Sequence, residues 1–100
     1  MYNLRTPHAN YWVTIRFKRY SNNRHVLELL DVDDGCPVMV ATVNLPAVSL
    51  GESEVIIKNY SENEGVLEFL QENGIVGPVK REVQTGWVTC PIVDLLKRPV

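Results

Sequence analysis

The sequence predicts an α+β domain, in which an antiparallel sheet of about five to six strands carries one short helix packed on one face. Residues 11–20 alternate between apolar and polar side chains, which is typical of a half-buried strand. Further short apolar runs are separated by Gly, Pro, Asn and Asp, as in proteins built from hairpins. Only residues 61–73 combine helix-start residues with apolar side chains at helical spacing. The predicted order is β-β-β-β-α-β-β, within a single domain over residues 1–100.

The chain begins with a predicted irregular arm over residues 1–9, which contains Pro7 and shows little periodicity. The first strand follows at 11–20, with one side expected to be buried and the other exposed. Its odd positions carry the apolar side chains of Tyr11, Val13, Ile15 and Phe17. Its even positions carry the amphipathic, polar or basic side chains of Trp12, Thr14, Arg16, Lys18 and Tyr20.

Three more strands are predicted before the helix. Residues 21–24 are polar and Asn-rich, which suits a tight turn because Asn tolerates a positive φ. Residues 25–32 are apolar at both odd and even positions, which favours a central strand. An Asp-Asp-Gly turn at 33–35 predicts a hairpin into a third strand over 37–45, so the first three strands form an antiparallel meander. A short fourth strand is predicted over 54–58.

The predicted helix begins with a capping box, in which Ser61 and Glu64 each accept a backbone N–H of the other. Gly65 then lies inside the helix, at a cost of about 1 kcal/mol relative to Ala. Gly74 suits the left-handed position that follows a helix end. The apolar stripe of this helix consists of Val66, Phe69 and Leu70, with Leu67 at its edge.

Two strands are predicted after the helix. Residues 75–84 resume a strand pattern, and a Thr-Gly turn leads into a final strand over 87–92. Pro91 places this last strand at an edge of the sheet, because proline cannot donate to a strand ladder. Residues 93–96 suggest a brief helical turn. An edge strand at 87–92 or 54–58 could pair with a second copy, so a monomer and a homodimer are both open.

The net charge is −2, but positive and negative residues are concentrated in different segments of the chain. Residues 1–27 carry +5, residues 28–76 carry −9 and residues 77–100 carry +2. One explanation is that the two ends neutralise the middle of the chain in the fold. The other is a dipolar surface that steers a charged partner.

Targeting and chemical motifs are sparse. No apolar run approaches the roughly 18 residues that span a bilayer, and the N-terminus lacks a secretory signal, so a cytoplasmic location without membrane contact is predicted. Cys36 and Cys90 lack the spacing of a zinc site, and free thiols are favoured over a disulfide. The acidic segment 31–35 is explained by turn chemistry. No local motif supports a dyad of His25 with either thiol, so we predict no catalytic residue, metal or cofactor.

Two surfaces are candidates for binding. Trp12, Arg16, Lys18 and Tyr20 share one face of the first strand, where aromatic and basic side chains could stack on bases and contact phosphates. Alternatively, Arg16 and Lys18 pair across strands with Glu28 or Asp31. The outer face of the helix carries Glu62, Glu64, Glu68 and Glu72. It is either a solvated face or an acidic surface that docks on a basic partner, in the manner of a nucleic-acid mimic.

Three segments carry a resemblance to a known family: residues 37–46 with their Thr-Val-Asn-Leu pattern, residues 55–61, and residues 66–70 followed by Gly74. Over residues 25–77 the chain resembles a family of small uncharacterised bacterial proteins found on phages and mobile elements. The resemblance implies a small antiparallel α+β domain and a phage or plasmid origin, and it brings no catalytic residues with it.

We therefore predict a small accessory protein of a phage or mobile element that docks on another protein, with interference in a host system as one outcome. Its surface would be the first-strand face or the acidic helix. The alternative is a nucleic-acid-binding domain that uses the first-strand face. An enzyme that uses Cys and His ranks last.

Overall fold

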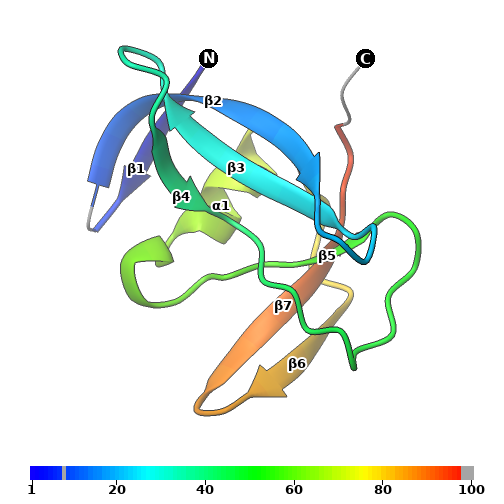
Figure 1. The fold of residues 1–100 in the computed structure, drawn as a ribbon. Helices are drawn as coiled ribbons and strands as arrows, with labels where there is room; N and C mark the ends of the chain where they lie inside the picture. The colour runs from blue at the N-terminus through cyan, green and yellow to red at the C-terminus, as the bar shows by residue number, and fades with distance from the viewer. Residues whose placement is uncertain (8, 98–100) are drawn as a thin grey trace.

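The chain folds into two antiparallel sheets and one α-helix in a computed structural model, which describes residues 1–7 and 9–97 (Figure 1). The first sheet consists, in spatial order, of β1 (Tyr2–Thr6), β2 (Ala9–Arg19), β3 (His25–Asp31) and β4 (Pro37–Val40). The second consists of β5 (Glu54–Ile56), β7 (Val88–Asp94) and β6 (Arg81–Thr85), with β7 in the middle. The helix α1 spans Val66–Glu72, after a 3₁₀ turn at Ser61–Asn63. The predicted α+β class, with antiparallel strands and one short helix, is confirmed.

The two sheets meet at one crossing point, where the chain leaves β4 and passes beside the end of β5 (Figure 1). Thr42 and Ile57 form an isolated antiparallel bridge there. The N–H of Lys58 donates to the carbonyl of Ala41 at 2.8 Å, and that of Val43 donates to Ile56 at 3.1 Å. The predicted strands therefore divide between two connected sheets instead of filling one.

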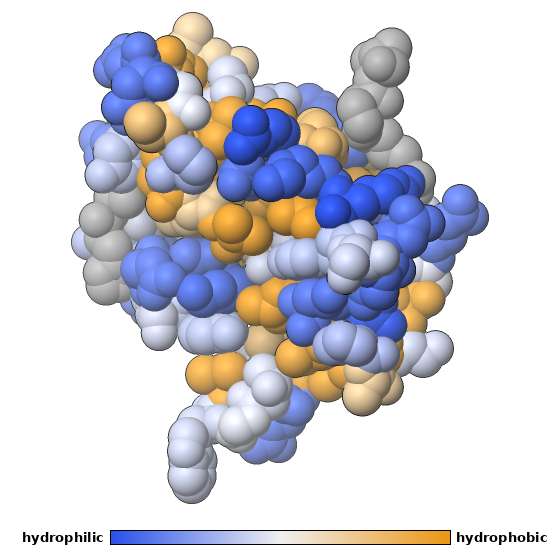
Figure 2. Space-filling view, in the orientation of Figure 1, coloured by the Kyte–Doolittle hydropathy of each residue, from blue (hydrophilic) through white to orange (hydrophobic). Residues whose placement is uncertain are grey.

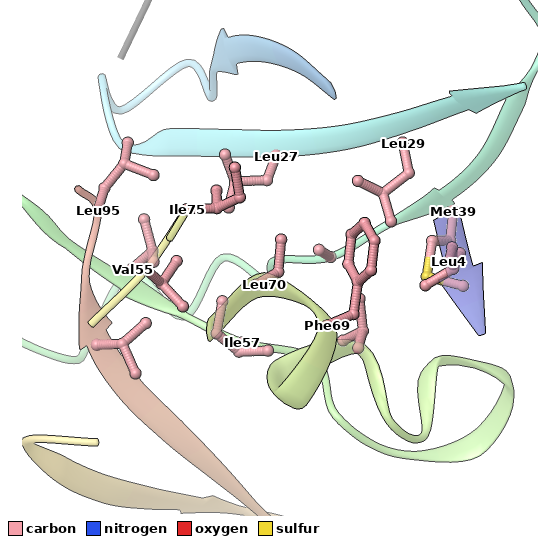
Figure 3. Packing of buried hydrophobic residues seen from close by; sticks show 14 of the residues in the cluster. Leu4, Leu27, Leu29, Met39, Val55, Ile57, Phe69, Leu70, Ile75 and Leu95 are labelled. Carbon is pink, nitrogen blue, oxygen red and sulfur yellow. The ribbon is translucent and has the colours of Figure 1, made fainter. Parts of the chain in front are cut away.

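The main core lies between the inner face of the first sheet, α1 and the second sheet. Figure 3 shows Phe69 and Leu70 of α1 pointing toward Leu27 and Leu29 of β3. Burying a side chain of this size contributes about 1.5–3 kcal/mol, so these contacts hold a seven-residue helix that would not persist alone. The predicted apolar stripe of the helix is confirmed, since Val66, Phe69 and Leu70 are buried. A smaller cluster around Ile56, Cys90 and Ile92 covers the other face of the second sheet.

The predicted irregular arm over residues 1–9 is wrong, because β1 pairs with β2 from Tyr2 to Thr6. Leu4 is fully buried, and the ring of Tyr2 packs edge-on against Phe69 with centroids 6.3 Å apart. Pro7 lies in the tight turn after β1 and not within the strand. The burial of Tyr2 and Leu4 against α1 is what makes this segment a strand, and those contacts are not visible in the local sequence.

The predicted capping box is also wrong. Ser61 has a positive φ of 53°, and the N–H of Glu64 donates to its backbone carbonyl and not to its side chain. α1 begins only after Gly65. The φ of this glycine is 95°, a left-handed conformation that separates the helix from the preceding 3₁₀ turn. The missing cap is supplied by Asn59, whose Oδ1 accepts the N–H groups of Gly65 at 3.2 Å and Leu67 at 3.0 Å. Gly65 therefore ends one element and starts the next.

Pro91 lies in the central strand of the second sheet, so the predicted edge position is wrong. Its carbonyl accepts the N–H of Ile57 at 2.9 Å, whereas the carbonyl of Ile92 accepts that of Lys80 at 2.9 Å on the other side. The N–H and C=O of one strand residue point to the same side. The donor that Pro91 lacks would therefore face the carbonyl of Ile57, one residue beyond the end of β5, and the ladder with β6 needs no donor there.

Other predicted elements also differ from those of the structure. β4 ends at Val40, because the chain then crosses to the second sheet. β6 starts at Arg81, after the Gly-Pro break that follows Val76. The predicted helical turn at 93–96 is wrong, because Val93 lies in β7 and Leu95 forms a bridge with Val76.

Candidate functional site

Arg16 and Lys18 on the outer face of β2 lie beside Glu28 of β3. Arg16 is directly opposite Glu28 in the ladder, and its Nε donates to Glu28 Oε1 at 2.7 Å. Lys18 Nζ lies 4.0 Å from the same oxygen. Figure 2 shows hydrophilic side chains gathered over β2 and β3 on this face. One carboxylate thus partly neutralises two cations, which is the cross-strand pairing expected as the alternative to a nucleic-acid surface.

Tyr20, at the end of this strand, is held by the crossing point between the sheets. Its hydroxyl lies 3.2 Å from the carbonyl and 3.1 Å from Oγ1 of Thr42. A shallow pocket of about 450 Å³ joins it to Lys58 and Glu62, which form an ion pair at 2.7 Å. Tyr20 and Glu62 are thus parts of the join between the sheets.

Trp12 is 55% exposed and lies opposite Asn3 of the edge strand β1. It lines a cleft of about 520 Å³ together with Asn3 and Arg5 on β1 and Glu68 and Glu72 on α1. We call this the β1 cleft. Its remaining lining residues are Met1, Tyr2, Gly65, Phe69 and Asn73. The structure thereby brings one residue of the predicted first-strand face together with two residues of the predicted acidic helix.

The acidic residues of the predicted helix separate into different environments. Glu62 belongs to the 3₁₀ turn, and Glu64 is exposed in the link before α1. Glu68 and Glu72 lie on α1 in the β1 cleft and are exposed. Within residues 1–7 and 9–97, the side chains of Glu68 and Glu72 form no ion pair or hydrogen bond. Two carboxylates without an ion-pair partner therefore face this cleft, which also contains the cation of Arg5.

The open edge of β1 borders the same cleft. The carbonyl of Trp12 accepts the N–H of Val32 at 3.0 Å, so the backbone groups of Trp12 point toward β3. Its cross-strand neighbour Asn3 is then in a non-hydrogen-bonded pair, and the backbone groups of Asn3 point away from β2. The same holds for Arg5, two residues further along. β1 thus presents the N–H and C=O groups of Asn3 and Arg5 at its outer edge.

A second hollow adjoins Trp12 on its other side. It has a volume of about 620 Å³ and is lined by Met1, Asn10, Tyr11, Trp12, Asp31, Val32 and Asp33. Met1 and Tyr11 are 76% and 41% exposed, so Trp12 lies in an exposed apolar region at the end of the first sheet. Sequence reasoning missed Met1, Asn3 and Arg5, and the alternation of Tyr2 and Leu4 was the signal that could have revealed β1.

Glu54 in the second sheet is a carboxylate held by several hydrogen-bond donors. It is 8% exposed, and its carboxylate accepts hydrogen bonds from the N–H of Gly51 at 2.7 Å and from Arg81 at 2.7 Å. Lys80 lies 3.0 Å from its other oxygen. These contacts, with the Gly51 hydrogen bond the largest, lower the pKa of Glu54 to about 2. Glu54 borders a hollow of about 290 Å³ beside Arg24 and His25, but its carboxylate is held by three partners that link β5 to β6, so we regard the cluster as structural.

The two thiols are free, with Cys36 exposed and Cys90 buried. The charge and hydrogen bond of Asp34 raise the pKa of Cys36, and burial raises the pKa of Cys90. A nucleophilic thiol needs a lowered pKa. His25 Nε2 lies 3.1 Å from the carbonyl of Glu52. Among the described residues, no group of three His, Cys, Asp or Glu side chains could hold a metal ion.

Comparisons with known proteins found no match among protein-family models, curated proteins or solved structures. In the part of the chain that the structure describes, no helix has the length and apolar character needed to cross a membrane.

Proposed function

We propose that this chain acts by binding another protein, and that the β1 cleft is its binding surface. The proposal is carried by one observation: an exposed tryptophan and two unpaired carboxylates line the same cleft beside an open strand edge. Trp12 comes from β2, and Glu68 and Glu72 come from α1. The protein would be a small accessory protein that docks on its target, as the sequence predicts.

The chemistry of the cleft favours a basic partner. Tryptophan side chains are frequent among the residues that dominate binding energy at interfaces. Glu68 and Glu72 attract cations, and this attraction increases the rate and specificity of association. A partner that places an apolar or aromatic group against Trp12 and lysine or arginine against α1 would satisfy both parts of the cleft.

Nucleic-acid binding on the outer face of β2 is the second candidate. It is supported by the exposure of Trp12 and by side-chain exposures of 51% for Arg16 and 50% for Lys18. It is weakened by Glu28, whose carboxylate lies against both cations. Nucleic-acid affinity depends on uncompensated positive charge, so this candidate ranks second.

A displayed library of random peptides tests the proposed function. We expect the wild-type chain to select peptides rich in Lys or Arg with an apolar or aromatic residue. The variant that combines W12A, E68K and E72K should bind the selected peptides at least about tenfold more weakly.

The control variant combines W87A, E52K and E82K, which removes a fully exposed tryptophan and reverses two exposed carboxylates elsewhere. It should bind the selected peptides as the wild type does. Equal loss in both variants, or no basic enrichment, would refute the proposal.

A further inference from the structure

The geometry points to the way in which the partner binds: an extended segment of another protein adds to the open edge of β1 as a fifth strand of the first sheet. This inference rests on the proposed function, since it uses the same cleft. It names the ligand class as an extended peptide in which basic residues alternate with apolar ones.

The edge of β1 has the groups that strand addition needs. The N–H and C=O of Asn3 and Arg5 point away from β2, as the Trp12 carbonyl contact with Val32 requires. Among the described residues, no backbone hydrogen bond joins these groups to another segment. An added strand would satisfy them, and such main-chain bonds supply much of the affinity in this type of recognition.

The two sides of an added strand would meet different surfaces. Asn3 and Arg5 share the outer face of the sheet with Trp12, whereas Tyr2 and Leu4 face α1. Side chains on one side of the ligand would therefore lie near Trp12 and Arg5, where apolar residues fit and cations do not. Those on the other side would lie near Glu68 and Glu72, and basic residues fit there.

The spacing of Glu68 and Glu72 along α1 also matches the spacing of side chains along one side of a strand. α1 runs antiparallel to β1 along the cleft, because Tyr2 packs on Phe69 and Thr6 lies beside Gly65. Glu68 and Glu72 are one helical turn apart, which is about 6 Å along the axis. Same-side residues of a strand are about 6.8 Å apart. Two successive basic residues on one side of the ligand can therefore each meet one carboxylate.

A second copy of this chain is a poor occupant for the edge. If two β1 strands paired antiparallel about a two-fold axis perpendicular to the sheet, both α1 helices would lie on the same face. Glu68 and Glu72 of the two copies would then approach each other, and like charges at such an interface oppose association. The carboxylates of α1 therefore favour a basic segment from a different protein.

The probe is a capped heptapeptide in which Lys and Val alternate. The control peptide has the same composition with its lysines together at one end. Calorimetry should give at least about tenfold weaker binding for the control, because its charges cannot all lie on one side. Two further peptides carry N-methyl groups on the valine amides or on the lysine amides.

Strand addition predicts that only one of the methylated peptides loses binding, by about tenfold or more, because only one set of amides faces β1. The set is that of valine for antiparallel addition and that of lysine for parallel addition. If both methylated peptides bind as the parent does, or both lose affinity equally, strand addition is refuted while basic-peptide binding stands. If no basic peptide binds, the proposed function itself fails.

A protein variant gives a second, independent readout. N3P removes an edge donor that does not bond to β2, and N3A is the matched control that keeps the donor. We expect N3P to bind at least about tenfold more weakly than N3A, which lacks the same side chain but keeps the backbone donor. Unchanged binding by a folded N3P would contradict strand addition, and a self-association that E68K and E72K strengthen would identify a second copy as the occupant instead.

Discussion

Arg16 of β2 and Glu28 of β3 face each other across the ladder, with Arg16 Nε 2.7 Å from Glu28 Oε1. The glutamate side chain is 10% exposed and the arginine side chain is 51% exposed. E28Q keeps the shape and removes the charge, so we expect the free energy of unfolding to fall by about 0.5–1.5 kcal/mol, since half of the pair is solvated. Urea unfolding followed by circular dichroism measures this. An unchanged midpoint would show that the ion pair adds no stability.

The same substitution separates the two candidate functions. E28Q leaves Arg16 and Lys18 uncompensated, so it should tighten binding to a labelled single-stranded oligonucleotide at low salt if this face binds nucleic acid. The double variant W12A/R16A should abolish that binding. Fluorescence anisotropy of the labelled strand, measured across a salt series, is the readout. No change in anisotropy with either wild type or E28Q would eliminate the nucleic-acid candidate.

The start of α1 depends on Asn59, whose Oδ1 accepts the N–H groups of Gly65 and Leu67. We expect N59A to lower the free energy of unfolding by about 1 kcal/mol, which is typical for loss of an N-terminal cap. N59D keeps an acceptor at this position and should retain most of the stability. Chemical denaturation of the three proteins tests this, and a cost for N59D as large as that for N59A would contradict the capping role.

β1 should be a structural strand and not a dispensable arm. Leu4 is fully buried in the main core, so L4A should cost about 2–5 kcal/mol. N3A, at the neighbouring half-buried position, removes only exposed side-chain hydrogen bonds to Asn10, Tyr11 and Arg5, so it should cost no more than about 1 kcal/mol. Thermal unfolding of both variants decides the point. If L4A were as stable as the wild type, the prediction of an irregular arm over residues 1–9 would be supported instead.

Acid should remove the stability that Glu54 contributes. Its folded pKa of about 2 lies below the ordinary value of 4.5, so its contribution is fully present above pH 4.5 and is lost as the pH falls toward 2. E54Q lacks this titration. The stability difference between wild type and E54Q should therefore shrink between pH 5 and pH 2, as measured by the denaturant midpoint. A constant difference over this range would exclude a lowered pKa.

The sequence predicted those elements whose determinants are local. The Asp-Asp-Gly hairpin is present, with Gly35 at φ 73°, and Asn23 takes a positive φ in the Asn-rich turn. Gly74 follows the helix end with φ 69°, and residues 25–31 form a central strand, as their apolar residues on both faces indicated. In each case a turn residue or a run of neighbouring side chains specifies the conformation.

The errors lie where contacts outside the local periodic pattern decide. β1 is a strand because Tyr2 and Leu4 pack on α1, more than 60 residues away. Gly65 separates two elements because Asn59 satisfies the helix start from outside. Pro91 fits a central strand because β5 ends beside it.

The candidate site was predicted in pieces. Trp12, Glu68 and Glu72 were singled out from the sequence, but as members of two separate surfaces. Their meeting depends on how α1 lies along β1, which no local pattern encodes. Arg16 and Lys18 proved to be partners of Glu28. The origin in a phage or mobile element stays a prediction.

Both tryptophans of this chain are on its surface, and this affects how it can be observed. Trp87 sits at the tip of the β6–β7 hairpin, which projects at the lower left of Figure 2, and its exposed fraction is 102%. Trp12 is already more than half solvated. Intrinsic emission should therefore shift little when the chain unfolds, and a W87F background would leave one indole whose spectrum reports directly on whatever enters the space beside β1.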